Sequence, residues 1–271
     1  MVSVKEAYIK GAEILKNAAI ESYRLDARVL LEHILGLESG KLPLYYDKII
    51  TNDQKKEYER SILKRAEHIP VSYITNKKEF YSLPFYVEEG VLIPRGDTEI
   101  LVSEALKLKK KKIADVCSGS GCIGLTLAKL QPESEVTLFD ISPKAISVCK
   151  KNIELLGIKN ARVIKTDILK EELPEKYDLI VSNPPYIPQS DINSLEKTVK
   201  DYEPVSALTD GDDGLTFYKR LKNLSEKYLN NGGAIFCEIG INQLTDIKNI
   251  FGEIEYTCDF AGIPRVIKRY L

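Results

Sequence analysis

Apolar side chains recur at helical spacing through the first quarter of the chain. One set follows a capping box at Ser3–Glu6, and a second set ends at Gly36, a residue type that commonly terminates helices. Another capping box, Thr51–Gln54, opens a further helix. Residues 1–75 are therefore predicted to form a small helical domain.

Residues 79–87 break this pattern with an aromatic run that is typical of β-structure. We expect a hairpin that turns at Leu83-Pro84, and residues 76–95 are predicted to link two domains. Asp97 then precedes an apolar stretch, so it is predicted to be the N-cap of a helix.

From Ile113 onward, apolar runs of strand length alternate with helical patterns. Ser142-Pro143 marks one helix start and Gly157 its end, because serine caps and proline suits the first turn. Such alternation is typical of a parallel sheet with crossover helices, so residues 96–271 are predicted to be an α/β domain. The predicted strands are 113–117, 136–140, 162–165, 178–182, 234–239, 254–258 and 265–270.

The composition of the 271 residues is that of an ordinary globular protein, with 44% hydrophobic and 29% charged side chains. Because 39 basic residues balance 40 acidic ones, no global charge favours nucleic acid or an anionic membrane. The basic run at 107–112 is interpreted as a solvated helix end, and the alternative is a nucleic-acid patch. No apolar run is long enough to span a membrane, and the N-terminus lacks the apolar core of a signal peptide.

The five cysteines include no CxxC pair, which indicates free thiols in a reducing cytosol. The chain has only two histidines, which argues against a histidine-based metal site. We therefore expect a cytoplasmic protein without a metal.

The segment Asn183-Pro184-Pro185-Tyr186 follows an apolar run that reads as a buried strand. Two consecutive prolines stiffen the backbone at the carboxyl edge of the sheet, where ligands of open α/β folds bind. The asparagine oxygen and nearby carbonyls can accept hydrogens, and the tyrosine offers a flat face. These features suit a planar group bearing an NH2; the alternative is a proline-rich surface turn.

A glycine-rich segment, Asp115-Val116-Cys117-Ser118-Gly119-Ser120-Gly121, leaves the first strand of the α/β region. With Gly124 it spells G-x-G-x-x-G, and Asp140 ends the next strand, so a nicotinamide dehydrogenase is one interpretation. The position of Asp115 inside the strand suits a cation better than a pyrophosphate, and no hydride-transfer constellation follows. S-adenosylmethionine, which has an adenosine and a charged amino-acid end, fits better.

Under either interpretation Asp140 would accept hydrogen bonds from ribose hydroxyls. Asp167, which follows the third strand, could reach the adenine amino group, or it could be an ordinary loop acid.

Both segments resemble motifs of known enzymes. Asp115–Gly121 resembles the first motif of class I S-adenosylmethionine-dependent methyltransferases, and Asn183–Tyr186 resembles the (D/N/S)PP(Y/F) motif of enzymes that methylate planar nitrogens. The flanking sequence resembles the protein-(glutamine-N5) methyltransferases of the HemK/PrmC family, which act on peptide chain release factors. The segments concerned are Phe80–Pro84, Leu92–Glu99, Tyr202–Pro204, Ala207-Leu208, Asp213–Leu215 and Asp259–Val266.

This resemblance implies a Rossmann-like sheet of seven strands with the last one antiparallel, joined by a β-hairpin to an N-terminal helical domain that docks the substrate. It implies N5-methylation of the glutamine in the Gly-Gly-Gln motif of class 1 release factors, with release factors 1 and 2 as partners and S-adenosylmethionine as cofactor. We expect a monomer that binds neither nucleic acid nor membrane.

The resemblance also implies site residues. Asn183 and Pro184 would accept the amide hydrogens of the substrate, Tyr186 would pack on the amide plane, and Pro185 would complete the substrate site. Two residues depart from the family pattern, since Cys117 replaces a common glycine and Gly96 a usual proline. The expected cofactor-binding residues are Asp115, Cys117, Ser118, Gly119, Ser120, Gly121, Asp140, Ile141, Asp167, Ile168 and Asn183.

Three other functions remain open. A glutamine methyltransferase of a ribosomal protein would share nearly every motif. A nucleic-acid exocyclic-amine methyltransferase would call for a recognition insertion or a basic face, which the sequence does not indicate. A non-enzymatic nucleotide-binding scaffold would leave the Asn-Pro-Pro-Tyr segment without a role. The long stretch 187–214 is expected to fold over the active site.

Overall fold

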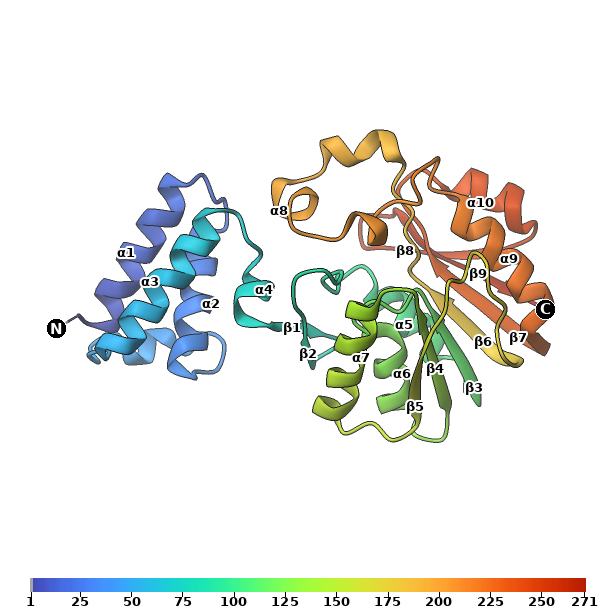
Figure 1. Ribbon diagram of the computed structural model, residues 1–271, viewed down its shortest axis with the longest axis horizontal. Coiled ribbons are helices and arrows are strands. Elements are labelled where there is room, and N and C mark those ends of the chain that lie inside the picture. Colours follow the sequence, from blue (N-terminus) through green and yellow to red (C-terminus); the bar gives the residue numbers. More distant parts are fainter. Residues whose placement is uncertain (1) are drawn as a thin grey trace. The chain divides into compact units, whose positions relative to one another are not determined.

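The computed structural model describes residues 2–271, and contacts divide the chain into two compact units. We call Met1–Asn76 the helical unit and Lys77–Leu271 the sheet unit, and describe each separately (Figure 1). No helix within residues 2–271 is both long and apolar enough to cross a membrane.

The helical unit forms around an apolar core that includes Leu15, Leu30 and Leu31. Both predicted capping boxes are present, with the side chains of Ser3 and Thr51 each accepting the N–H three residues further on. Gly36 ends a helix in a left-handed conformation, as its position predicts. The elements are α1 (Val4–Asn17), α2 (Tyr23–Leu35), η1 (Leu42–Tyr45), α3 (Asn52–Ala66) and α4 (Val71–Thr75).

A hairpin of β1 (Lys77–Phe80) and β2 (Leu83–Tyr86) opens the sheet unit. The predicted turn at Leu83-Pro84 is wrong: the chain turns at Tyr81-Ser82, where both residues have positive φ, as the favoured two-residue hairpin turn requires. Pro84 lies within β2, which tolerates it because it is an edge strand.

The main sheet has seven strands in the order β5-β4-β3-β6-β7-β9-β8. The first five in this order run parallel, and β9 is antiparallel to both of its neighbours, so the predicted fold class is confirmed. β7 begins five residues before the predicted strand, at Leu229 instead of residue 234. The strands are β3 (Lys112–Val116), β4 (Glu135–Asp140), β5 (Ala161–Lys165), β6 (Tyr177–Ser182), β7 (Leu229–Glu238), β8 (Glu255–Cys258) and β9 (Pro264–Tyr270).

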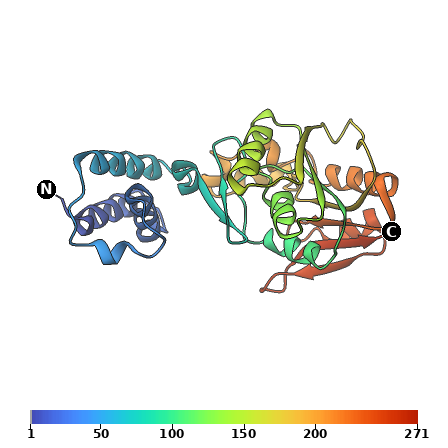
Figure 2. The same cartoon turned by 90° about the horizontal axis from the view of Figure 1, so that it is seen from below.

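Helices cover both faces of this sheet (Figure 2). Successive side chains of a strand point to opposite faces of the sheet. Ile113 belongs to the core with α5, α6 and α7, whereas Ala114 belongs to the core with α9 and α10. Burial on both faces explains why the central strands read as continuous apolar runs. The helices are α5 (Glu99–Leu106), α6 (Cys122–Leu130), α7 (Pro143–Leu156), α9 (Thr216–Tyr228) and α10 (Leu244–Phe251).

The long connection after β6 has short helical elements of its own. These are η2 (Gln189–Ser194), α8 (Lys197–Lys200) and η3 (Val205–Ala207). Its later part, from Pro204 to Asp210, contributes to the wall of a cavity, as expected for a segment that folds over a site.

Candidate active site

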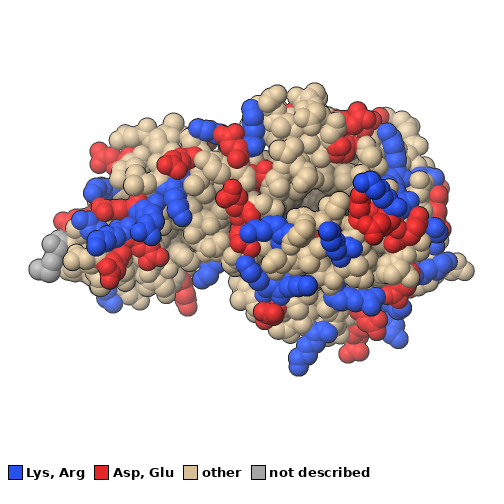
Figure 3. All heavy atoms as spheres, viewed as in Figure 1, with Lys and Arg blue, Asp and Glu red and all other residues tan. Residues whose placement is uncertain are grey.

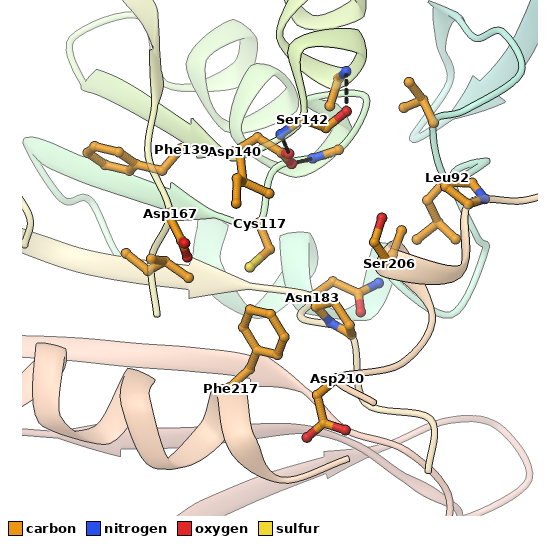
Figure 4. A pocket seen from close by; sticks show the side chains of 18 of the residues that line it. Leu92, Cys117, Phe139, Asp140, Ser142, Asp167, Asn183, Ser206, Asp210 and Phe217 are labelled. Atoms are coloured by element: carbon orange, nitrogen blue, oxygen red, sulfur yellow. Dashed lines mark hydrogen bonds between the residues drawn. The ribbon is translucent and has the colours of Figure 1, made fainter. Parts of the chain in front are cut away.

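The carboxyl ends of the parallel strands open into a cavity of about 320 Å³ in the sheet unit (Figure 4). Side chains from the ends of β3, β4, β5 and β6 form its inner wall, and the segments around residues 90–92 and 204–210 form the remainder. The predicted site residues on the wall are Cys117, Gly119, Asp140, Ile141, Asp167, Ile168, Asn183 and Pro185.

The glycine-rich loop after β3 turns through left-handed backbone conformations. Cys117, Gly119 and Gly121 have φ of 61°, 55° and 81°. A side chain on Gly121 would press against Leu125, Leu138 and Cys149, so the loop packs tightly there. Cys117 adopts a conformation that glycine adopts freely, and its side chain lies on the cavity wall (Figure 4). Ser118, Ser120 and Gly121 do not line the cavity.

Asp140 ties the end of β4 to this loop. Its Oδ2 accepts the N–H of Gly119 at 2.8 Å, and its Oδ1 accepts the N–H of Ser142 at 2.9 Å. Burial raises the pKa of Asp140, and these N–H groups partly oppose the rise. Each carboxylate oxygen has a second lone pair, so this side chain can still accept hydrogen bonds from vicinal hydroxyls. These acceptor oxygens therefore fit the ribose hydroxyls of S-adenosylmethionine.

Asp115 lies behind the cavity wall and has no exposed surface. Its Oδ2 accepts the N–H of Gly124 at 2.8 Å, and a Cβ on Gly124 would come within 2.8 Å of the same oxygen. Burial raises the pKa of Asp115 to about 7. Its Oδ1 is buried without a partner among residues 2–271. The carboxyl thus braces the start of α6 and does not itself line the cavity.

Asp167 and Ile168 lie on the cavity wall beyond β5. One oxygen of Asp167 accepts the N–H of Leu169 at 3.2 Å, and the other pairs with Lys170 at 3.0 Å. Because Lys170 is mostly exposed, this ion pair is weak and leaves the carboxylate available to a ligand amine.

Asn183 projects onto the wall directly after β6 (Figure 4). Its Nδ2 donates to Thr98 Oγ1 at 3.2 Å, and its Oδ1 has no protein partner among the described residues. Pro185 lies on the wall next to it, whereas Pro184 does not. The amide thus presents a free acceptor beside the glycine-rich loop.

Tyr186 is held in place by several groups. Its hydroxyl donates to Glu238 Oε1 at 3.2 Å, and its backbone carbonyl accepts from Gln243 Nε2 at 3.0 Å. A Cβ on Gly214 would lie 2.2 Å from that carbonyl, and one on Gly240 would lie 3.0 Å from the ring. Burial raises the pKa of the Tyr186 hydroxyl. These contacts fix the ring as a support of the loop, and Tyr186 is not among the residues that line the cavity.

Three consecutive residues before α5 each reach a different element. Asp97 pairs with Arg265 of β9 at 3.1 Å, which is why the prediction that it caps α5 is wrong. Thr98 holds Asn183, as described above. Glu99 accepts the N–H of Tyr81 at the hairpin turn, at 2.8 Å. This segment joins the hairpin, the last strand and the Asn183 loop.

Glu203 connects two segments that contribute to the cavity wall. Its carboxylate accepts the N–H of Ile93 at 3.2 Å and pairs with Arg95. It therefore joins the segment before α5 to the connection after β6, and both segments contribute wall residues.

Many residues of the cavity wall were not predicted from the sequence. Most of them are apolar or small and belong to no recognisable motif. The sequence could have indicated Phe139, because it directly precedes Asp140. It could also have indicated Asp210, which lies in a stretch rich in Asp and Gly and accepts hydrogen bonds from backbone N–H groups of that stretch. Phe217 of α9 projects toward Cys117 and Asn183, which only the fold reveals (Figure 4). The missed residues are Gly90, Val91, Leu92, Phe139, Ser142, Ala145, Thr166, Leu169, Pro204, Ser206, Ala207, Thr209, Asp210 and Phe217.

Comparison with known proteins accounts for this architecture. A family model described as the PrmC N-terminal domain matches residues 6–75, and one described as the methyltransferase small domain matches residues 95–201. A methyltransferase structure from Pyrococcus furiosus superposes with a TM-score of 0.53 over 78% of this chain and 96% of that one. At 14% identity, this similarity shows the fold alone.

Two full-length relatives are more specific. The release factor glutamine methyltransferase of Clostridium acetobutylicum is 42% identical, and that of Clostridium botulinum is 39% identical. Each alignment covers 98% of this chain and 98% of the relative. The chain therefore belongs to the family of release factor glutamine methyltransferases.

Proposed function

We propose that this protein transfers a methyl group from S-adenosylmethionine to the side-chain amide nitrogen of a glutamine in the Gly-Gly-Gln motif of class 1 peptide chain release factors. The observation that carries the proposal is the free acceptor of Asn183, which lies on one cavity wall with the glycine-rich loop and Asp140. The names of the full-length relatives supply the substrate class.

The residues at the ends of β3, β4 and β5 are proposed to bind the cofactor. Asp140 would accept hydrogen bonds from the ribose hydroxyls, Asp167 would accept one from the adenine amino group, and Ile141 and Ile168 would contribute apolar contacts. When bound, S-adenosylmethionine supplies a methyl group on a sulfonium, which is already activated for transfer. The left-handed loop at Gly119 lets the backbone come close to the ligand.

Asn183 and Pro184 are proposed to orient the acceptor. An amide nitrogen is a poor nucleophile because its lone pair is delocalised into the carbonyl. If Asn183 Oδ1 and the Pro184 carbonyl accept the two N–H groups, the nitrogen is held with its lone pair toward the cofactor site. Most of the increase in rate then comes from orientation of the nitrogen. The two carbonyl dipoles also stabilise the positive charge that develops on it. One proton leaves this nitrogen to water after transfer.

Protein, not nucleic acid, is the proposed partner. Basic and acidic side chains are interspersed on the face of the sheet unit seen in Figure 3, without a continuous basic surface there. We propose release factors 1 and 2 as substrates, residues 1–75 as the docking domain, and a monomeric, cytoplasmic enzyme.

The experiment is transfer of tritium from methyl-labelled S-adenosylmethionine, with release factor, ribosomal protein and DNA offered separately. Label on the release factor, lost when its Gly-Gly-Gln glutamine is replaced by alanine, is the expected result. Label on ribosomal protein or DNA alone would assign one of the other methyltransferase functions.

A further inference from the structure

Phe260 is a fully exposed aromatic side chain in the turn between β8 and β9. Its relative exposure is 112%, the highest among the large apolar residues that the structure describes. Figure 2 shows the hairpin of these two strands, in red, projecting from the sheet unit. A ring that packs against nothing adds nothing to the core, so the fold itself gives Phe260 no role.

The turn that carries Phe260 has a fixed backbone. Asp259 Oδ1 accepts the N–H groups of Ala261 and Ile263 at 2.9 and 3.0 Å. The backbone N–H of Asp259 also donates to the carbonyl of Ile263 at 2.9 Å, which closes the turn. The ring is therefore presented at a defined place, and a partner that binds it has little chain entropy to remove.

The same turn is connected to the loop that carries Asn183. Arg265 Nε donates to Asp259 Oδ2 at 2.9 Å, and the same guanidinium pairs with Asp97 at 3.1 Å. Thr98, the next residue, accepts a hydrogen bond from Asn183 at 3.2 Å. Because β9 begins beside the end of β7, the turn lies at the same edge of the sheet as Asn183, and these polar contacts fix one relative to the other.

A protein substrate has to lie on this edge of the sheet. The cavity of about 320 Å³ is far smaller than a protein, so a protein whose glutamine reaches Asn183 must contact the surface around the opening. Ile241, 56% exposed, is a second apolar side chain at this edge, directly after Gly240, which packs against the Tyr186 ring. Exposed aromatic residues beside a site are typical anchors of protein–protein contacts.

The chemistry of the turn suits a protein better than a nucleic acid. Residues 260–264 carry no charge, and Arg265 is neutralised by Asp97 and Asp259. A base could stack on an aromatic ring, but such rings act together with cations that bind the backbone phosphates, and the turn supplies none that is unpaired. An apolar depression on a protein surface is the better match.

We infer that Phe260 anchors the release factor by entering an apolar depression beside its Gly-Gly-Gln loop, an inference that rests on the proposed function. Binding there buries the ring, and the fixed turn brings the glutamine to Asn183 in one register. Phe260 touches neither the cofactor nor the reacting amide. Its contact is the same in the ground state and the transition state, so it lowers KM for the protein substrate and leaves kcat unchanged.

The test compares Phe260→Ala with Leu155→Ala in methyl transfer to release factor. Leu155 is 57% exposed but lies at the opposite edge of the sheet, because α7 starts at the end of β4 and leads to the start of β5. We expect Phe260→Ala to raise KM for release factor roughly 10-fold, as the loss of an interface anchor does, with kcat and the Kd for S-adenosylmethionine unchanged. Leu155→Ala changes none of the three.

A second measurement identifies the partner directly. With p-benzoylphenylalanine in place of Phe260, irradiation cross-links the enzyme to release factor, whereas the same replacement at Leu155 does not. Because Phe260 is fully exposed, both of its variants fold as the wild type does, and urea unfolding of wild type and Phe260→Ala coincides.

An unchanged KM for Phe260→Ala, or cross-linking from position 260 only to a second copy of this chain, would overturn the inference. A lower kcat at unchanged KM would also overturn it, since Phe260 would then act in the chemistry. If the wild type transfers no methyl group to release factor, the proposed function fails, and the cross-link still decides whether Phe260 contacts release factor. The two failures are therefore distinguishable.

Discussion

Two loops leave neighbouring strands at the same edge of the sheet, yet they are stabilised in different ways. The loop after β3, Cys117–Gly121, takes its shape from left-handed residues and contributes the backbone of Gly119 and the side chain of Cys117 to the cavity. The loop after β6, Asn183–Tyr186, has no residue with positive φ and contributes a side chain. Residues distant in sequence hold it in place, namely Thr98, Gly214, Glu238, Gly240 and Gln243.

The difference follows from what each loop presents. Backbone N–H groups are aimed by φ and ψ, which the residues of the loop set locally. A side-chain amide has rotational freedom, and its two ends are nearly the same shape, so hydrogen-bond partners must orient it. The loop after β3 should therefore be sensitive to its own residues, and the loop after β6 to residues elsewhere.

The largest expected effect is on the rate of methyl transfer. Asn183→Ala removes one aimed acceptor, so we expect kcat to fall roughly 10²- to 10³-fold, by analogy with the loss of one oxyanion-hole donor. Cofactor affinity, measured by calorimetry, should change little because the loop after β3 is intact. A kcat within a few-fold of wild type would contradict the role of Asn183.

The support of the second loop can be disrupted from outside it. Gly214→Ala places a Cβ 2.2 Å from the Tyr186 carbonyl, whereas Gly211→Ala, at a similar positive φ, meets nothing within 4 Å. Both variants carry the strain of a left-handed alanine, so their difference isolates the clash. We expect Gly214→Ala to be less stable than Gly211→Ala by about 2 to 3 kcal/mol in urea unfolding. Equal stabilities would show that the contact with Tyr186 is not tight.

The first loop rests on Asp115, whose pKa is raised to about 7 in the folded chain from 3.8. The folded state therefore keeps a proton that the unfolded state releases above pH 3.8, so stability falls as pH rises toward 7. Asp115→Asn should remove this dependence, which amounts to about 2 kcal/mol between pH 5 and pH 7. Parallel stability curves for the variant and the wild type would argue against a protonated Asp115.

The smallest expected effect concerns Cys117, which has a φ of 61°. Cys117→Val should reduce stability by about 1 kcal/mol, because a β-branched side chain tolerates the left-handed region poorly. Cys117→Gly should stay close to wild type, since relief of strain is offset by the entropy of glycine in the unfolded chain. Thermal unfolding of the three proteins checks this order, and a valine variant as stable as wild type would break it.

Sequence reasoning succeeded where the signal was local and strong. The strands were placed within a few residues because fully buried strands are continuous apolar runs, and the capping boxes marked α1 and α3. It failed where two local signals competed. Leu83-Pro84 has the composition of a turn, but the hairpin turns at Tyr81-Ser82. Asp97 has the position of a helix cap, but its carboxylate pairs with Arg265.

For the site, the sequence identified which strand ends carry the polar residues, but it could not decide which side chains reach the cavity. Asp115 and Tyr186 belong to the two motifs, and neither lines the cavity. Which side chains line it depends on the residues that pack against them, here Gly124 against Asp115 and Gly240 against Tyr186. The predicted roles of the site residues stay predictions until the variants above are measured.

By itself the sequence determined the α/β fold, the two ligand loops and their stiffness, because these depend on apolar periodicity, glycine and proline within a few residues of one another. Only the tertiary structure decided how the Asn183 amide is held. Its partner Thr98 is 85 residues away in the chain, and Glu238, which accepts the hydroxyl of Tyr186 in the same loop, lies on β7. Hydrogen bonds between such positions depend on sheet order and helix packing, which no local pattern encodes.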